Sequence, residues 1–189
     1  FLPNPFVVKE GDSYKFANSE FSMGMVRSFY GNMGITLRAY VYILEYGKQY
    51  IADIAKNAVL NANYIKACLK DYFHLKYKSD TLHEVVFDDS EMPNHVTTMD
   101  LAKGLIDRGF HPPTVYFPII VHGAIMIEPT ETESKETLDS FIEAMIDIAN
   151  TAKTNPENII NAPLNTAISR PDETLAARKP VLKYCPNAD

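Results

Sequence analysis

The sequence predicts an α+β domain in which helices pack on a small, largely antiparallel sheet. Long stretches with apolar residues at three- and four-residue steps indicate helices, at 22–46, 49–72, 97–109 and after 130. Short apolar runs bounded by turn residues indicate strands, at 82–88, 114–120 and 124–129. The two strand candidates 114–120 and 124–129 flank His122-Gly123 and are close enough to form a hairpin.

Composition limits the kind of protein this is. The 189 residues carry a net charge of −6, with 46% hydrophobic and 22% charged residues. A globular domain has this composition, and the lack of a basic cluster argues against nucleic acid or an anionic membrane as the main partner. Cys68 and Cys185 form no disulfide or zinc pattern, so we expect a reducing compartment, the cytoplasm.

The order of the segments predicts three parts. Residues 1–21 read as an extended arm or a hairpin around the turn Glu10-Gly11-Asp12. Residues 22–161 carry the helices and strands of the domain, and residues 162–189 read as a proline-rich arm. Because the chain starts at Phe1 with a proline-rich extended run, we expect a fragment of a longer protein.

Glycines punctuate the first long helix. Gly24, Gly31 and Gly34 interrupt the stretch 22–46, and an interior glycine costs a helix about 1 kcal/mol relative to alanine. A kink or a close approach of another backbone would explain them. Gly47 is a plausible left-handed end of this helix, with a second helix following from about Gln49.

Two later helices have predicted starts. Thr97 followed by Asp100, and Thr130 followed by Glu133, have the spacing of a capping box, in which the two side chains bond each other's backbone N–H groups. Gly109 is a natural end for the first of these helices.

Residues that could carry chemistry are scattered. The five histidines match no metal-ligand spacing, so no metal site is expected. No serine–histidine–aspartate set, phosphate loop or paired-carboxylate pattern is recognisable. His111 stands before two prolines that fix the backbone, and either turns the chain or belongs to a site. Asn57, Asn61 and Asn63 lie within the second helix, and hydrogen bonds from Asn57 and Asn61 to a neighbouring helix or loop are favoured over ligand contact.

Four segments in order resemble one family. They are SFYGNMGITLRAYVYI (28–43), NAVLNANYIKACL (57–69), the stretch GFHPPTVYFP to MIEPTETESKETLD (109–139), and ARKPVLKY (177–184). Together they resemble glycine dehydrogenase (decarboxylating), the P-protein of the glycine cleavage system. HPPTVYFP is similar to subunit 2 of the two-subunit, prokaryotic form rather than to the long single-chain form.

This resemblance implies a pyridoxal-phosphate enzyme of fold type I, of which the chain would be the C-terminal small domain. The family holds its cofactor through a lysine in a histidine–lysine motif before a glycine-rich run, and this chain has no such motif. The resemblance therefore implies that the whole protein binds pyridoxal phosphate, and that the chain alone holds none covalently, has no catalytic residue and is inactive.

The expected partners and site residues follow from the same resemblance. The whole protein would decarboxylate glycine and pass the aminomethyl group to the lipoyl arm of the H-protein, with subunit 1 as its companion. Polar side chains beside fixed backbone keep their geometry, so they are candidates for the edge of the cofactor or substrate cleft. These candidates are Arg27, Asn32, His111, Tyr116 and Glu128.

Two alternatives remain open at this stage. The chain could be a free-standing, non-enzymatic interaction or regulatory domain that binds partners through its asparagine-rich helix. It could also be the small domain of another fold-type-I enzyme such as an aminotransferase, although the stretch MIEPTETESKETLD favours the P-protein family.

Overall fold

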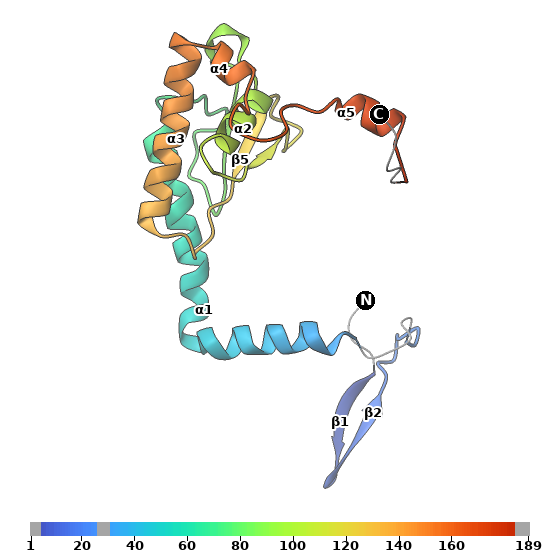
Figure 1. Ribbon diagram of the computed structural model, residues 1–189. Coiled ribbons are helices and arrows are strands. Elements are labelled where there is room, and N and C mark those ends of the chain that lie inside the picture. The colour runs from blue at the N-terminus through green and yellow to red at the C-terminus, as the bar shows by residue number, and fades with distance from the viewer. Residues whose placement is uncertain (1–4, 26–30, 184–189) are drawn as a thin grey trace. The chain divides into compact units, whose positions relative to one another are not determined.

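The computed structural model describes residues 5–25 and 31–183 (Figure 1). The chain divides into two compact units, Phe1–Ile51 and Ala52–Asp189. Helix α1 (Met33–Leu69) contributes residues to both units. The predicted fold class is confirmed, because the structure combines helices with small antiparallel sheets.

The first unit begins with a two-stranded antiparallel hairpin of β1 (Phe6–Glu10) and β2 (Ser13–Ala17). Gly11 lies in the connecting turn at a φ of 60°, which glycine adopts without strain. The Ser13 hydroxyl donates to the Glu10 carbonyl, and Lys15 pairs with the Glu10 side chain at 2.6 Å across the hairpin. The turn signal at residues 10–12 thus lies where the sequence predicts it.

Helix α1 does not begin at Ser22, as the periodicity predicts, but at Met33. Gly24 and Gly31 have φ angles of 90° and 129°, which a right-handed helix does not allow, so neither residue belongs to a helix. Asn32 precedes the helix, and its side-chain oxygen accepts from the Ile35 N–H at 3.3 Å. The start is therefore set by a polar residue after the last irregular glycine.

A break in α1 lies at Gly47, with φ 59° and ψ −175°. This backbone conformation is essentially restricted to glycine, so the sequence signal for a helix end at Gly47 is sound although helical turns continue on both sides. In the second half, the predicted stripe is buried at Ala62, Ile65 and Leu69, whereas Ile51 is 51% exposed.

Three strands form the sheet of the second unit, in the order β3-β5-β4 and all antiparallel. Strand β3 (Val85–Asp88) pairs with β5 (Ala124–Ile127), which pairs with β4 (Thr114–Val115). Strand β4 is much shorter than the run 114–120 predicts, because Tyr116 turns away at a φ of 57° and Pro118 has no N–H for a ladder. All four residues of the central strand β5 are buried.

Helix α2 (Thr98–Ile106) has the predicted capping box. The Asp100 carboxylate accepts from the Thr97 N–H at 2.8 Å, and the Asp100 N–H donates to the Thr97 hydroxyl at 3.4 Å. Gly109 follows the helix at a φ of 81°, as expected for a residue that ends it.

The capping box expected from Thr130 and Glu133 is wrong. Helix α3 (Lys135–Thr154) takes Ser134 as its N-cap, and the Ser134 hydroxyl accepts from the Thr137 N–H at 3.2 Å. The Thr130 hydroxyl instead contacts Thr132 at 2.7 Å, which keeps residues 130–133 in a turn. Ser134, four residues after Thr130, therefore sets the start of the helix.

The core of the second unit joins the sheet to α1, α2 and α3. Its fully buried large side chains include Phe87, Ile125, Leu101, Leu105, Met145 and Ile148. Helix α4 (Glu157–Ile160) follows Pro156 and adds the buried Ile159. Within the arm predicted for 162–189, a short helix α5 (Glu173–Arg178) forms with Asp172 as its N-cap. No helix among the described residues is long and apolar enough to span a bilayer.

Candidate functional site

A pocket of about 430 Å³ lies in the second unit beside the central strand. The walls come from Ile65 of α1, from Met126 and Ile127 of β5, and from the first turns of α3, together with the segment 110–114 and with Glu128, Pro129 and Glu133. This volume is in the range of small-molecule sites. The pocket brings together His111 and Glu128, two of the residues that the sequence singles out.

His111 is held by the turn that follows α2. Gly109 reverses the chain, and Phe110 then packs its ring against Phe141 of α3 at 5.4 Å and nearly at right angles. The His111 Nδ1 lies 3.0 Å from the Pro112 carbonyl oxygen. A carbonyl only accepts, so Nδ1 carries the proton, and a neutral imidazole keeps Nε2 as an acceptor.

Glu128 leaves the end of β5 and is exposed, whereas Pro129 beside it is buried. Five residues further on, Glu133 also lines the pocket, just before the N-cap of α3. The loop between them is tied to α1, because the Asn61 side chain donates to the Thr130 carbonyl at 2.9 Å. The prediction that Asn61 bonds a neighbouring loop is therefore confirmed, and the bond fixes one wall of the pocket.

Asn63 also bonds backbone carbonyls. Its amide donates to the carbonyls of Val59, within the same helix, at 2.8 Å and of Thr81, in a loop, at 2.9 Å. Asn61 and Asn63 thus each bond one carbonyl outside the helix, which accounts for weak helix formers inside it.

A polar cluster joins α1 to α3 next to the pocket. The Tyr64 hydroxyl donates to Asp139, and the Lys135 ammonium lies 2.6 Å from the same carboxylate and 5.3 Å from the Tyr64 ring centre. The hydrogen bonds from Lys135 and then Tyr64 lower the pKa of Asp139. The bond to Asp139, with a smaller one to Tyr64, raises the pKa of Lys135 to about 12.

The remaining sequence candidates lie elsewhere. Arg27 falls outside the described residues. Asn32 belongs to the first unit, where it serves the start of α1. Tyr116 is 49% exposed and is absent from the residues that line the pocket; its N–H donates to the Ala124 carbonyl at 2.7 Å. Of the four described candidates, the structure therefore brings together only His111 and Glu128.

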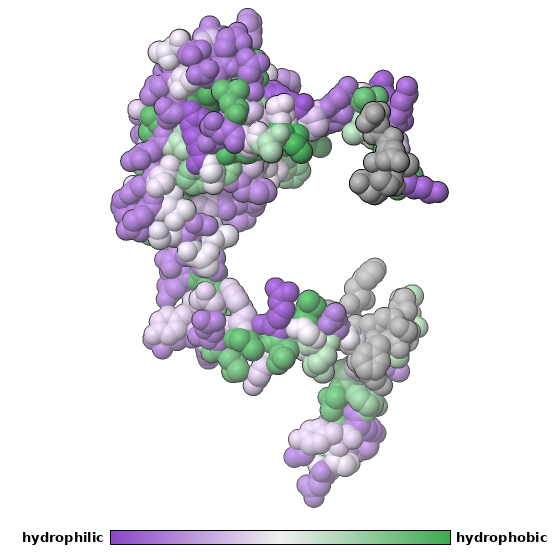
Figure 2. All heavy atoms as spheres, in the orientation of Figure 1, coloured by the Kyte–Doolittle hydropathy of each residue, from purple (hydrophilic) through white to green (hydrophobic). Residues whose placement is uncertain are grey.

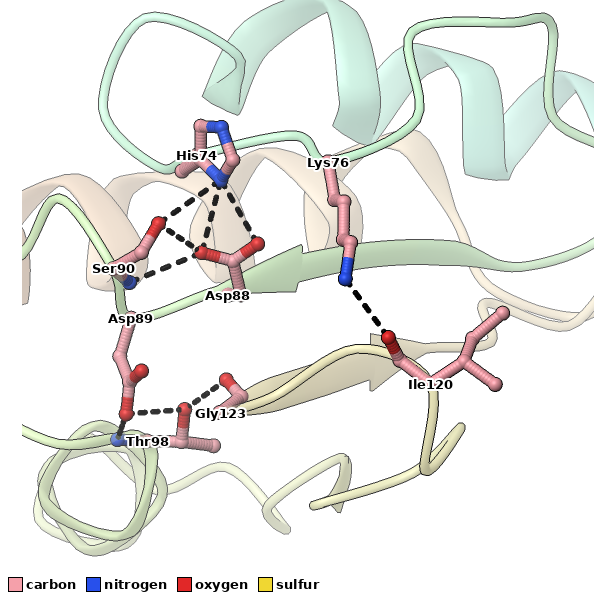
Figure 3. Close-up of polar contacts among 8 residues, drawn as sticks. All are labelled: His74, Lys76, Asp88, Asp89, Ser90, Thr98, Ile120 and Gly123. Carbon is pink, nitrogen blue, oxygen red and sulfur yellow. Dashed lines mark hydrogen bonds and ion pairs between the residues drawn. The ribbon is translucent and has the colours of Figure 1, made fainter.

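His74, Asp88 and Ser90 meet at the end of β3 (Figure 3). The His74 Nδ1 lies 2.9 Å from the Asp88 carboxylate and 3.0 Å from the Ser90 hydroxyl. A nucleophilic triad uses opposite ring nitrogens for the acid and the serine, whereas here one nitrogen meets both. The cluster instead satisfies the buried Asp88, whose pKa burial raises but hydrogen bonds from Ser90 and His74 lower overall.

Strand pairing also collects potential metal donors. Val85 of β3 pairs with Ile127 of β5. Glu84 precedes Val85 and Glu128 follows Ile127, so the two glutamates lie next to each other at the ends of neighbouring strands. Donor atoms of His83, Glu84 and Glu128 lie within 4.8 Å of one another. The sequence spacing gives no sign of this group, because the pairing of two strands creates it. His83 and Glu128 are both exposed, and nothing else at this edge points to a metal ion.

Sequence reasoning missed several pocket residues. Glu133 reads as a helix cap, although in the structure it lines the pocket. Phe110 and Phe141 are 31 positions apart, and only the packing of α3 beside the turn brings their rings together. A signal for Glu133 was present, namely the acidic run EPTETE directly after a buried strand.

Comparison with known proteins gives a consistent picture. Residues 54–170 match the family model described as glycine dehydrogenase, C-terminal domain. Over 97% of its length, the chain is 54% identical to "Probable glycine dehydrogenase (decarboxylating) subunit 2" of Staphylococcus haemolyticus and 55% identical to that of Staphylococcus saprophyticus. The chain spans only 38% of the length of each of these relatives.

A solved structure shows the same fold. It is described as glycine decarboxylase (P-protein) of the glycine cleavage system, in inhibitor-bound form. The likeness has a TM-score of 0.53 at 19% sequence identity and covers 64% of this chain and 27% of the other. At this identity the likeness concerns the fold alone.

Proposed function

Because the chain belongs to the glycine dehydrogenase C-terminal-domain family, we propose that it acts as one domain of a subunit that decarboxylates glycine. Two relatives that are 54% and 55% identical to the chain are named as subunit 2 of this enzyme. The chain covers 38% of the length of each of them. Family membership removes the alternative of an aminotransferase domain. The parent enzyme would work with subunit 1 and pass the aminomethyl group to the lipoylated H-protein.

The cofactor expected for such an enzyme is pyridoxal phosphate, which serves as an electron sink when a carboxylate leaves. The pocket of the second unit does not fit it. Among the described residues that line it there is no lysine for a Schiff base and no arginine or lysine for a phosphate, while Glu128 and Glu133 would repel that phosphate. Any cofactor of the parent would therefore be held by residues outside this pocket.

Exposed apolar surface supports a domain that works inside a larger protein. The first half of α1 exposes several apolar side chains, with Ile35, Leu37, Val41 and Leu44 each more than half exposed. Figure 2 shows hydrophobic patches along the helix, among hydrophilic ones. Apolar surface gathered in this way is typical of a surface that another part of a protein covers. This observation disfavours the alternative of a free-standing regulatory domain, because other parts of the parent would cover the helix.

The role we propose for this chain is to supply one edge of the substrate cleft. The observation that carries it is the meeting of His111 and Glu128 at one pocket: His111 precedes β4 and Glu128 follows β5, and antiparallel pairing places these two strand ends side by side. Prolines at 112, 113 and 129 fix the backbone beside both residues, so their geometry costs little entropy when a ligand binds.

The test is made in the complete two-subunit enzyme with glycine–bicarbonate exchange as the assay. We expect Glu128→Gln and His111→Ala each to lower kcat/KM about tenfold, which corresponds to about 1.4 kcal/mol. Glu143→Gln is the matched control, because Glu143 lies on the exposed face of α3 away from the pocket. If both pocket variants match this control, the cleft-edge role is wrong.

A further inference from the structure

Uncompensated negative charge marks the rim of the pocket. Glu128 and Glu133 both line it, and none of the other described lining residues is a lysine or an arginine. Lys135 is two residues from Glu133, but its ammonium is bound to Asp139 at 2.6 Å and stacks against Tyr64. The cation closest along the chain is thus already paired, and the rim keeps its charge for a ligand.

His111 adds a third acceptor to this rim. Its Nδ1 proton is donated to the Pro112 carbonyl at 3.0 Å, which leaves Nε2 for a ligand, and in a neutral ring this nitrogen is an acceptor. Two carboxylates and an imidazole nitrogen together suit a group that donates several hydrogen bonds and carries positive charge. A primary ammonium has three such donors.

The inner part of the pocket is apolar. Ile65, Met126 and Leu138 are buried in its wall, and the Phe110–Phe141 pair closes one side with rings 5.4 Å apart. Aliphatic or aromatic carbon placed here would be removed from water at about 25 cal/mol per Å². The pocket thus combines an apolar interior with an anionic rim.

We propose that this pocket binds a small organic ligand with a primary ammonium head and an apolar body. The ammonium lies at the rim, between Glu128, Glu133 and His111, and the body lies against Phe110 and Met126. The inference concerns the same pocket as the proposed function and deepens it by naming the class of ligand, but it requires no turnover.

A competing occupant of the rim is a divalent cation. His83 and Glu84 lie with Glu128 in a group whose donor atoms are within 4.8 Å of one another. A metal ion there would use Glu128 and leave Glu133 and the apolar interior without a role. Substitution of Glu133 should therefore weaken the binding of an ammonium ligand but not that of a metal ion, whereas substitution of His83 should weaken metal binding alone.

The experiment is methyl NMR on the 189-residue chain, with hexylammonium as the ligand probe. Ile65, Ile127 and Met126 report on the pocket, while Met145 and Ile148 report on the distant core and on folding. If the core methyls show that the chain alone is not folded, the same titration is made in the complete subunit. Parallel titrations use hexanol, hexanoate and manganese(II).

We expect saturable shifts at the pocket methyls only, and binding of hexylammonium at least about fivefold tighter than that of hexanol. Glu128→Gln and Glu133→Gln should each weaken binding about two- to fivefold, the range of an exposed ion pair. Glu143→Gln, the control, should leave it unchanged.

Equal binding of hexanol or hexanoate would overturn the proposal, as would an unchanged affinity in the two pocket variants. Line broadening by manganese(II) that depends on His83 and Glu128, without a response to hexylammonium, would assign the rim to a metal instead. If hexylammonium binds as expected while Glu128→Gln and His111→Ala both leave glycine–bicarbonate exchange at the level of the control, the ammonium site stands and the cleft-edge function fails.

Discussion

Arg170 and Asp100 form an ion pair at 2.8 Å that ties the C-terminal arm to the N-terminus of α2. The Asp100 side chain is 7% exposed and the Arg170 side chain 35%. The same guanidinium donates to the Ala162 carbonyl at 2.7 Å. Since the second Asp100 oxygen is occupied by the capping box, Arg170 satisfies the oxygen that remains.

We expect Arg170→Met to lower the free energy of unfolding by about 1–3 kcal/mol, because it leaves a buried carboxylate oxygen without its partner. Arg178→Met is the matched control, since Arg178 is exposed in α5, and a change within about 0.5 kcal/mol is expected there. Urea unfolding followed by circular dichroism measures both. Equal midpoints for the two variants would show that the arm is not anchored by this pair.

The Asp88 site predicts a pH dependence of stability. Burial raises the Asp88 pKa, but hydrogen bonds from Ser90 and His74 outweigh it, so the folded pKa lies below the ordinary value of 3.8. A carboxyl group with a lowered pKa in the folded state stabilises above its unfolded pKa. That contribution is lost as the pH falls through the folded pKa.

Asp88→Asn should therefore destabilise the chain by about 1–3 kcal/mol at pH 7. The gap between the variant and the natural chain should stay constant down to about pH 5 and shrink below pH 3.8, the unperturbed pKa. Urea unfolding at pH 7, 5 and 3 measures the gap. As a control, Asp147→Asn removes a carboxylate that is 62% exposed and should change stability by less than about 1 kcal/mol. A gap as large at pH 3 as at pH 7 would contradict the assignment.

Gly123 packs directly on the Asp89 side chain. It has a φ of 64°, and a Cβ added there would lie 1.9 Å from the Asp89 Oδ1. Asp89 has little freedom to move, because its other oxygen accepts from the Thr98 N–H at 2.8 Å (Figure 3). Only glycine fits both the backbone conformation and the space.

Gly123→Ala should cost about 2–5 kcal/mol, the sum of a left-handed alanine and an overpacked contact. Gly109→Ala is the matched control: Gly109 also has a positive φ, at 81°, but a Cβ there would meet nothing within 4 Å, so about 1–2 kcal/mol is expected. Thermal unfolding gives the comparison. In an Asp89→Ala background, Gly123→Ala should cost no more than Gly109→Ala does, because only the left-handed backbone cost remains. If Gly123→Ala still costs more than the control there, the steric explanation is wrong.

The helix ends show how far local signals reach. The capping box of Thr97 and Asp100 and the break at Gly47 follow from residues within one turn of each other, and the structure has both. Helix α1 starts at Met33 and not at Ser22, because Gly24 and Gly31 adopt φ angles that a right-handed helix does not allow. Helix α3 starts at Lys135 because Ser134, and not Thr130, is its N-cap.

The candidate site was foreseeable only in part. His111 and Glu128 stand beside prolines, a signal that one sequence carries by itself. Their common pocket depends on the pairing of Thr114 with Met126, which sets where the two strand ends lie. The spacing of residues along the sequence does not predict strand register or the packing of distant segments, so it could not predict this pocket.

The amino-acid sequence alone determined the fold class, the family resemblance and most caps and turns, because these depend on neighbours along the chain and on apolar periodicity. Tertiary structure decided that Glu133 joins Glu128 and His111 at one pocket, that Tyr116 does not, and that Arg170 is paired with Asp100. The physical reason is that charge pairing and cavity lining depend on distances between side chains, and folding brings those together across many residues of chain.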